Sequence, residues 1–256
     1  MSPPSPPYAL AVWRRNLALY RRTWRLNILP NFFEPVFYLW AIGLGLGSYI
    51  SGMGGTTYVA FLAPALVCVA AMNGASYEGT YNAYVRLNFE KAYASMLTTP
   101  IQPEDVLAGE VLWAMTRASI YGGFFLLAVV AFGLVPLSAV PGALLVIPLT
   151  GLLFAAIAYA FTLAVPTIEF VSFYFTLFLT PLFLFSDVFF PLAERFSGRW
   201  LWLAEALPLI HPVRMMRALA TGRADGWLLF DALYIVVLSG VLLWVAARVT
   251  RRRLSS

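Results

Sequence analysis

Uncharged residues fill the middle of the chain. From Ala118 to Ile168 there is no Asp, Glu, Lys or Arg over 51 residues. A membrane-spanning helix needs about 20 apolar residues at about 1.5 Å rise each, so this stretch is long enough for two spans. Gly133-Leu134-Val135-Pro136 and Pro141-Gly142 supply a turn, because proline and glycine interrupt helices. Since backbone groups in a bilayer must be bonded internally, we predict a helical hairpin with spans at 118–135 and 142–165.

Four further apolar stretches also have the pattern of membrane spans, at about residues 31–50, 58–77, 170–186 and 227–247. Asn31 and Glu34 have the spacing of a capping box, and Pro35 suits the first turn of the helix that follows. The chain is therefore predicted to be an all-α polytopic membrane protein with six transmembrane helices, which form a single transmembrane domain over residues 1–256.

Three segments combine apolar and polar positions at helical spacing. In residues 8–29 the apolar positions, among them Trp13 and Trp24, fall at steps of three and four, which predicts an interfacial helix on the membrane surface. Residues 80–97 form a short amphipathic helix with a tyrosine-rich side. Residues 191–225 are divided by Pro208 and Pro212, and we expect two short amphipathic helices resting at the opposite membrane surface.

Composition and charge agree with a membrane protein. The chain is 61% hydrophobic and 11% charged, against about 25% charged residues in soluble domains. Twelve Lys and Arg residues fall in or beside the two terminal segments and the 78–117 segment, and five fall in 191–225. The positive-inside rule therefore places both termini in the cytoplasm. Because this placement accounts for the net charge of +5, no nucleic-acid partner is expected.

Motifs for catalysis, cofactors or metals are not found in the sequence. His211, Cys68 and Lys91 are each the only residue of their type, and neither GxxxxGK[ST] nor GxSxG occurs. We therefore expect no catalytic, cofactor or metal site in this chain, and an energy source outside it. His211 is interpreted as a structural histidine in a turn before Pro212.

Charged residues near the span ends are candidates for other roles. Glu34, Glu78 and Glu169 map to the cytoplasmic ends and are candidates for access or gating, whereas Asp187 and Asp231 are interpreted as helix caps.

Two pairs of residues have spacings that place them on one helix face. Gly43 and Gly47 form a GxxxG pair for helix packing, either within the subunit or in a dimer. Glu110 and Arg117 share a face, although seven residues do not ensure a direct pair.

The order of these elements resembles the membrane subunit of ABC-2-type exporters, and the local sequence resembles its nodulation protein J branch. The resemblance covers most of the chain and depends on the order and spacing of its motifs. These are EPVFYL at 34–39 before GLGLG at 43–47, YVAFLAP at 58–64, residues 71–84 leading to MLTTP at 96–100, DVLAGE at 105–110, FFP at 189–191 and LPLIHP at 207–212.

The resemblance implies a role for several segments. Residues 80–97 would be a coupling helix that docks on an ABC ATPase, and the short helices between spans five and six would face the periplasm. Two copies of this chain, as a homodimer, would join two ATPase copies in the bacterial inner membrane, in contact with membrane lipids. ATP and magnesium would bind at the ATPase. The candidate coupling residues are Tyr84, Arg86, Phe89, Glu90 and Tyr93.

The function implied by the resemblance is ATP-driven export of an amphipathic glycolipid or lipo-oligosaccharide, with no enzymatic activity in this chain. Efflux of a hydrophobic drug or antibiotic is the alternative within the family. An alternative of another class is a membrane-embedded enzyme that modifies lipids, with catalysis near Glu78, Glu110 or Glu169.

Overall fold

The computed structural model describes residues 4–45, 47, 49–50, 53, 55–192, 198–222 and 226–254. The side chains of residues 25–32, 34–35, 43–44, 199–200 and 253–254 are not described. Within these ranges the regular elements are helices, together with one isolated bridge between Met53 and Thr56. The expectation of an all-α protein is confirmed over the described residues.

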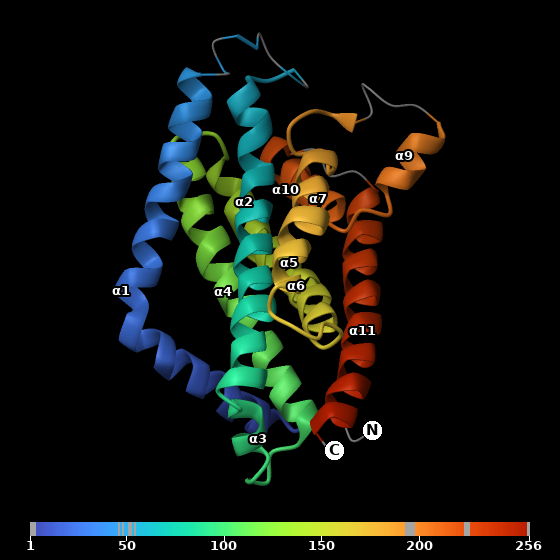
Figure 1. Cartoon of the computed structure of the whole chain (residues 1–256). Helices are drawn as coiled ribbons and strands as arrows, with labels where there is room; N and C mark the ends of the chain where they lie inside the picture. The colour runs from blue at the N-terminus through green and yellow to red at the C-terminus, as the bar shows by residue number, and fades with distance from the viewer. Residues whose placement is uncertain are drawn as a thin grey trace.

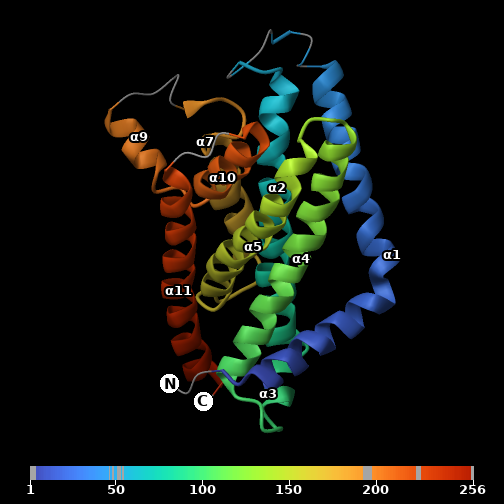
Figure 2. The same cartoon turned by 180° about the vertical axis from the view of Figure 1, so that it is seen from behind.

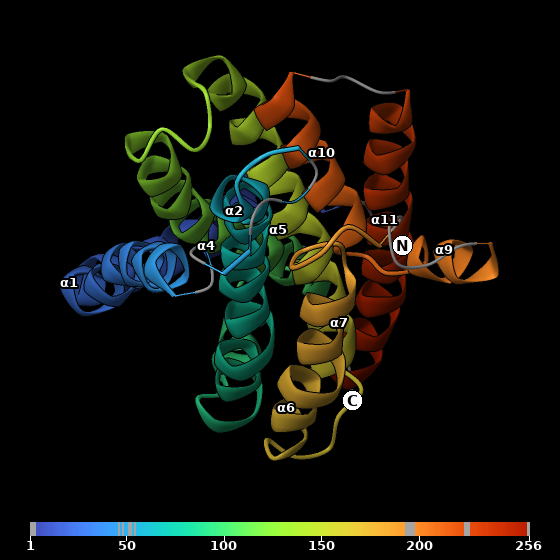
Figure 3. The same cartoon turned by 90° about the horizontal axis from the view of Figure 1, so that it is seen from above.

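The long helices run side by side along the molecule (Figure 1). They are α1 (Pro6–Leu44), α2 (Tyr58–Tyr77), α4 (Pro103–Ala131), α5 (Val140–Thr162) and α11 (Trp227–Leu254). Both chain ends lie near α3 (Ala92–Met96), at what we call the terminal end (Figure 1). The short helices α9 (Arg199–Ala204) and α10 (Ile210–Thr221) lie at the opposite, distal end. Figure 3 shows α1 and α11 on opposite sides of the bundle.

Four helices among the described residues are long and apolar enough to cross a membrane. They cover Tyr58–Phe89, Pro103–Ala131, Leu137–Thr162 and Trp227–Arg252. The apolar helix Phe170–Phe185 is shorter than the roughly 20 residues that a perpendicular span needs. A multi-pass membrane protein is therefore indicated, while the count of six spans stays a prediction.

A single helix, α1, replaces the two elements expected at 8–29 and 31–50. It runs without a break from Pro6 to Leu44, and its N-terminal part turns to cross α4 (Figure 2). Its buried residues there are Ala9, Val12 and Asn16, whereas Trp24 is 46% exposed. The predicted aromatic face is thus not the packed face; small side chains pack instead, because they allow a close approach to α4.

The second span continues past its predicted end at Tyr77. Two π-helical segments, Glu78–Asn82 and Val85–Phe89, extend α2, and the chain then turns at Lys91, which has a left-handed φ of 50°. The single helix predicted at 80–97 is therefore wrong in its bounds: α2 supplies its first part and α3 the rest. The charge of Glu78 predicts that the span ends there, but this carboxylate is buried beside arginines.

Helix ends elsewhere also differ from the predicted spans. α4 begins at Pro103, upstream of the span predicted at 118–135, and α11 continues to Leu254 through the basic tail, beyond the span predicted at 227–247. The helical run Phe170–Phe185 agrees with the span predicted at 170–186; it consists of α6 (Phe170–Phe173), a π-helical segment (Tyr174–Leu179) and α7 (Thr180–Phe185).

The helix α10 lies inside the bundle, packed among α2, α5 and α11, rather than on a membrane surface (Figure 1). Its residues Ile210, Pro212, Val213, Met215 and Met216 are buried. The surface position expected for this segment depends on its charges being exposed. Those charges are balanced by acidic partners within the protein, so the helix can be buried.

Candidate transport site

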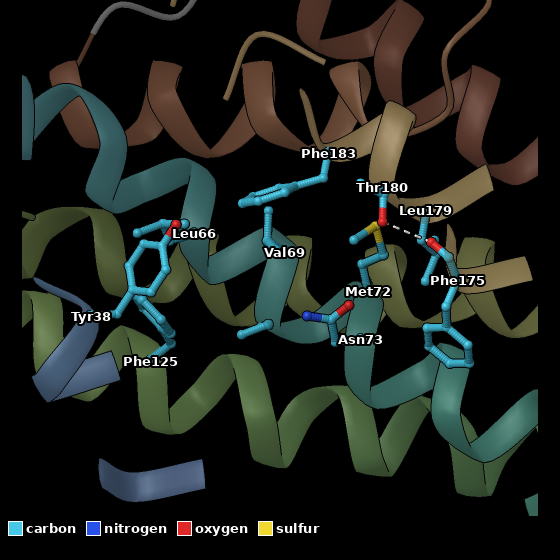
Figure 4. Close-up of a pocket in the computed structure, with 11 residues that line it drawn as sticks. Tyr38, Leu66, Val69, Met72, Asn73, Phe125, Phe175, Leu179, Thr180 and Phe183 are labelled. Carbon is cyan, nitrogen blue, oxygen red and sulfur yellow. Dashed lines mark hydrogen bonds between the residues drawn. The ribbon is translucent and has the colours of Figure 1, made fainter. Parts of the chain in front are cut away.

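A groove of about 250 Å³ runs between α1, α2, α4 and the Phe170–Phe185 helix. Figure 4 shows its wall: Tyr38 of α1 and Phe125 of α4 lie to one side, and Phe175 and Phe183 lie toward the other. Side chains of α2 line the space between them. The site therefore brings together four elements that are distant in the sequence.

The groove is mainly apolar and aromatic, with a few polar groups. The α2 residues that line the groove include Leu66, Val69, Met72 and Asn73. Among these four, Asn73 has the polar side chain, an amide. The hydroxyl of Thr180 donates to the carbonyl of Phe175 at 2.9 Å, inside the π-helical turn (Figure 4). An apolar wall with one or two polar groups is suited to a long amphipathic molecule.

A buried ion cluster joins α2 and α4 at the terminal end. Nη1 of Arg86 lies 2.7 Å from Oε1 of Glu78, and its Nη2 lies 2.6 Å from Oε2 of Glu110. Glu78 and Glu110 are 2% and 1% exposed. Asn16 of α1 donates to the other oxygen of Glu110 at 2.9 Å. The cluster therefore links the extension of α2 to α4 through the guanidinium of Arg86, and α4 to α1 through Glu110 and Asn16.

Further groups complete this cluster. Nε of Arg117 lies 3.5 Å from Oε2 of Glu78, and the hydroxyl of Tyr159 donates to Oε2 of Glu110 at 3.1 Å. Glu110 and Arg117, which share a helix face, thus pair with different partners rather than with each other. Opposite charges and hydrogen bonds offset the cost of burying these groups.

The five candidate coupling residues fall into two groups. Tyr84 and Tyr93 are 5% and 6% exposed, and the hydroxyl of Tyr84 donates to the carbonyl of Pro166 at 2.9 Å. Arg86 is held in the ion cluster. Phe89 is 64% exposed, and Glu90 beside it is also exposed. A partner chain at this end would therefore meet Phe89 and Glu90, which we call the exposed tip. Tyr84, Arg86 and Tyr93 connect this tip to the bundle.

The three candidate gating carboxylates are in different environments. Glu78 is in the ion cluster. Glu169 is exposed in the turn between α5 and α6, and a hydrogen bond from Thr167 lowers the pKa of its carboxyl. Glu34 lies on α1, where its side chain is outside the described residues. The structure does not bring Glu78 and Glu169 into one site, and their role in gating stays a prediction.

The predicted glycine pair is described only in part. Gly47 lies beside Val59: a Cβ added there would be 3.4 Å from its Cγ2, an ordinary contact. The surroundings of Gly43 are outside the described residues. A much closer approach occurs at Gly109 of α4, where an added Cβ would lie 2.5 Å from the carbonyl oxygen of Ala9. Gly109 is therefore required where α1 crosses α4.

A second charged cluster lies at the distal end, between α10 and α11. Nδ1 of His211 lies 2.8 Å from Oδ1 of Asp231, and its Nε2 lies 3.0 Å from the carbonyl oxygen of Glu205. Arg214 binds the carboxylates of both Glu205 and Asp231. The His211 ring stacks on Tyr234 at 3.7 Å between centroids. Asp231 is thus the centre of a buried network and not a helix cap.

Asp187 joins α7 to α10. It has a left-handed φ of 60° just after α7, and one carboxylate oxygen accepts from the backbone N–H of Leu192 at 2.7 Å. The other oxygen pairs with Arg217, whose guanidinium lies 4.0 Å from the ring centroid of Phe61. The distal arginines 214 and 217 are thereby neutralised, which explains why the positive charge in this segment can lie within the bundle.

Comparisons with known proteins identify the family of this chain. Residues 8–220 match the family model described as ABC-2 type transporter. Nodulation protein J of Rhizobium leguminosarum bv. viciae is 34% identical over 84% of this chain and 82% of its own length. The same-named protein of Sinorhizobium fredii (strain NGR234) is 32% identical over 99% and 97%. The inner membrane transport permease YadH of Escherichia coli K12 is 23% identical over 81% and 80%. The chain therefore belongs to the ABC-2 type transporter family, as a membrane permease subunit.

Proposed function

We propose that this chain, as a homodimer with two copies of an ABC ATPase, exports an amphipathic glycolipid or lipo-oligosaccharide across the bacterial inner membrane. The similarity to the nodulation proteins J over most of the chain favours this cargo over others in the family. The single structural observation that carries the proposal is the aromatic groove beside α2. Both termini would lie on the cytoplasmic side, where α3 and the exposed tip meet the ATPase (Figure 1).

The groove suits the apolar part of such a cargo. Tyr38, Phe125, Phe175 and Phe183 offer flat, polarisable surfaces along which an acyl chain can slide without forming strong directional contacts. Asn73 adds an amide near the middle of α2. In a transporter, weak and repeated contacts are preferable to one tight site, since the cargo must also leave.

The terminal end offers a route for the energy of ATP hydrolysis. Phe89 and Glu90 are exposed at the end of the helix whose middle lines the groove. An ATPase that moves this tip would therefore move the groove wall. ATP and magnesium would be bound by the ATPase, and this chain would contribute no catalytic group to hydrolysis.

Two other functions remain as alternatives. An apolar groove also accepts a hydrophobic drug or antibiotic, so the cargo must be tested directly. A lipid-modifying enzyme is less well supported, because the buried carboxylates of Glu78 and Glu110 are both held by Arg86. A general acid or base needs a carboxyl that can exchange its proton with the substrate, and these are committed to an ion pair.

The proposal is tested by co-purifying the chain with an ABC ATPase from the same organism and reconstituting both in proteoliposomes. We expect ATP-dependent transport of an acylated oligosaccharide that stops when the ATPase lysine of the phosphate-binding loop is replaced. Phe183→Ala should lower transport severalfold without loss of the complex. Phe173→Ala is the matched control: this residue is on the same helical run, 51% exposed and outside the groove. Transport of a drug but not of the oligosaccharide would show that the cargo is a drug. Transport without the ATPase would refute the proposal.

A further inference from the structure

A second cavity lies at the terminal end, separate from the groove. Its volume is about 460 Å³, within the range of about 300–1,000 Å³ of small-molecule sites. We call it the α1–α4 cavity. Its lining comes from α1, from the π-helical extension of α2 and from α4, and includes Asn16, Tyr20, Arg22, Asn82, Trp113 and Arg117.

The wall of this cavity combines aromatic rings with hydrogen-bonding side chains. The rings of Tyr20 and Trp113 meet edge to face at 5.5 Å between centroids, and the guanidinium of Arg117 lies 4.7 Å from the Tyr20 ring centroid. Each side-chain amide uses one donor within the protein, Asn16 to Glu110 at 2.9 Å and Asn82 to Glu78 at 3.0 Å, which leaves a second N–H on each for a ligand. Aromatic faces beside planar polar groups are the surfaces on which sugar rings stack and form hydrogen bonds.

Two donors on this wall have no hydrogen-bond partner within the protein. They are the hydroxyl of Tyr20 and Nε of Arg117, and both atoms are buried. Arg117 as a residue is 6% exposed, and its Nε has only the 3.5 Å ion-pair contact with Glu78. A buried donor without an acceptor is costly, so such groups need an explanation. Acceptor oxygens of a ligand in the adjoining cavity would supply the missing partners.

The charges on the wall select the class of ligand. Arg22, Arg86 and Arg117 line the cavity together with the carboxylates of Glu78 and Glu90, and Arg86 also pairs with Glu110. A phosphate or other anion would be attracted by the arginines but would also face two carboxylates. A neutral polyhydroxylated group offers hydroxyl donors to the carboxylates and oxygen acceptors to the arginines, so it matches both kinds of wall group.

We propose that the α1–α4 cavity binds the glycan headgroup of the cargo on the cytoplasmic side, before the cargo reaches the aromatic groove. This inference rests on the proposed function. It assigns the headgroup to a cavity lined partly by α1, a helix that has no part in the proposed coupling to the ATPase. Asn73 in the groove and Glu78 at the cavity are five residues apart on one helix, about 7.5 Å along its axis. Headgroup and acyl chain of one molecule can therefore engage the two sites in succession.

The test measures binding to the ATP-free complex of the chain with its ATPase, in nanodiscs of uncharged lipid. Three fluorescent probes are compared: an acylated tetrasaccharide, the same tetrasaccharide without the acyl chain, and a lysophospholipid with the same chain and an anionic phosphate headgroup. Arg22→Ala and Tyr20→Phe should each weaken binding of both saccharide probes about fivefold to tenfold, as expected for one lost hydrogen bond. Binding of the lysophospholipid should change less than twofold.

Two features of the variants separate binding from folding. Tyr20→Phe removes only a hydroxyl that has no partner in the protein, so the thermal unfolding temperature should not fall. Arg21→Ala is the matched control, because Arg21 is the exposed neighbour of Arg22 on the same helix and does not line the cavity.

The outcomes distinguish the inference from the function on which it depends. If the wild-type complex transports the acylated tetrasaccharide while the Arg22→Ala and Tyr20→Phe variants bind it normally, the cavity assignment is wrong and the proposed function stands. Equal weakening of lysophospholipid binding would show an anion site instead. If the wild type neither binds nor transports the saccharide probe, both proposals fail.

Discussion

Nδ1 of His211 faces the carboxylate of Asp231 at 2.8 Å, and neither residue has exposed surface. The other ring nitrogen faces the carbonyl oxygen of Glu205 at 3.0 Å. Carbonyl and carboxylate oxygens only accept hydrogen bonds, so both ring nitrogens must carry protons for both bonds to form. Arg214 also donates to Asp231, which keeps that carboxylate ionised. With both bonds formed, His211 would be an imidazolium that joins α10 to α11.

Nitrogen NMR tests this protonation state directly, because the chain has a single histidine. In ¹⁵N-histidine-labelled protein at neutral pH we expect both ring nitrogens to show the chemical shifts of protonated sites. Asp231→Asn removes the charge that stabilises the imidazolium, so one nitrogen should become unprotonated. A neutral ring in the wild-type protein would show that only one of the two ring contacts is a hydrogen bond and that the assignment is wrong.

Arg86 should be among the residues most costly to replace. Arg86→Met leaves the buried carboxylates of Glu78 and Glu110 facing each other without a shared cation, and we expect a loss of about 3–5 kcal/mol in the free energy of unfolding. Thermal unfolding of the detergent-solubilised chain measures this loss of stability. Lys91→Met is the control, expected within about 0.5 kcal/mol, because Lys91 is exposed and makes no ion pair with a described residue.

Neutralising all three charges gives a further check on Arg86. The triple variant Glu78→Gln, Arg86→Met, Glu110→Gln should recover part of the lost stability, because no buried carboxylate is then left unpaired. If Arg86→Met is as stable as wild type, the cluster does not hold the helices together.

The exposed tip should affect partner binding rather than folding. Phe89→Ala combined with Glu90→Gln should weaken co-purification of the ATPase about tenfold, since exposed aromatic side chains often dominate interfaces. The unfolding temperature should stay within about 1–2 °C, as for other surface substitutions.

A control for the tip is available at the other end of the molecule. Phe132 follows α4 at the distal end and is 53% exposed, so Phe132→Ala removes a comparable apolar surface away from the tip. Normal ATPase binding by the tip variant, or equal loss in the Phe132 variant, would contradict the coupling role of Phe89 and Glu90.

The crossing of α1 and α4 depends on one glycine. In Gly109→Ala the new Cβ would meet the Ala9 carbonyl and the Val12 Cβ, both at 2.5 Å, so one helix must move. We expect a loss of about 1–3 kcal/mol. Gly123→Ala on the same helix has nothing within 4 Å and should be neutral or stabilising by up to about 1 kcal/mol. Circular dichroism during thermal unfolding measures both; equal effects would show that the close contact at Gly109 is not limiting.

The apolar runs of the sequence predict the helices well where no charge interrupts them. The hairpin of α4 and α5, the Phe170–Phe185 run and the start of α11 all lie where the pattern places them. The family resemblance is confirmed by the comparisons. These features depend on local composition, which a sequence shows directly.

The pattern fails where distant charges pair inside the protein. The charge of Glu78 predicts the end of a span, and those of Arg214 and Asp231 predict a surface segment and a helix cap, because an isolated charge is costly in a bilayer. Arg86 pairs with Glu110, 24 residues away, and Arg214 with Asp231, 17 residues away, and no local signal identifies these partners. Asn16 was missed for the same reason. The spacing of Glu110 and Arg117 pointed to the right helix face but not to their partners.

The helix from Tyr58 to Phe89 runs unbroken over 32 residues, about 48 Å at 1.5 Å each. In the coupling that we propose, an ATPase that tilts the Phe89 end about the ion cluster around Arg86 would move the longer part of the helix, which lines the groove, by a greater distance. A compound that binds the Phe89 end would then block passage of cargo without competing for the groove.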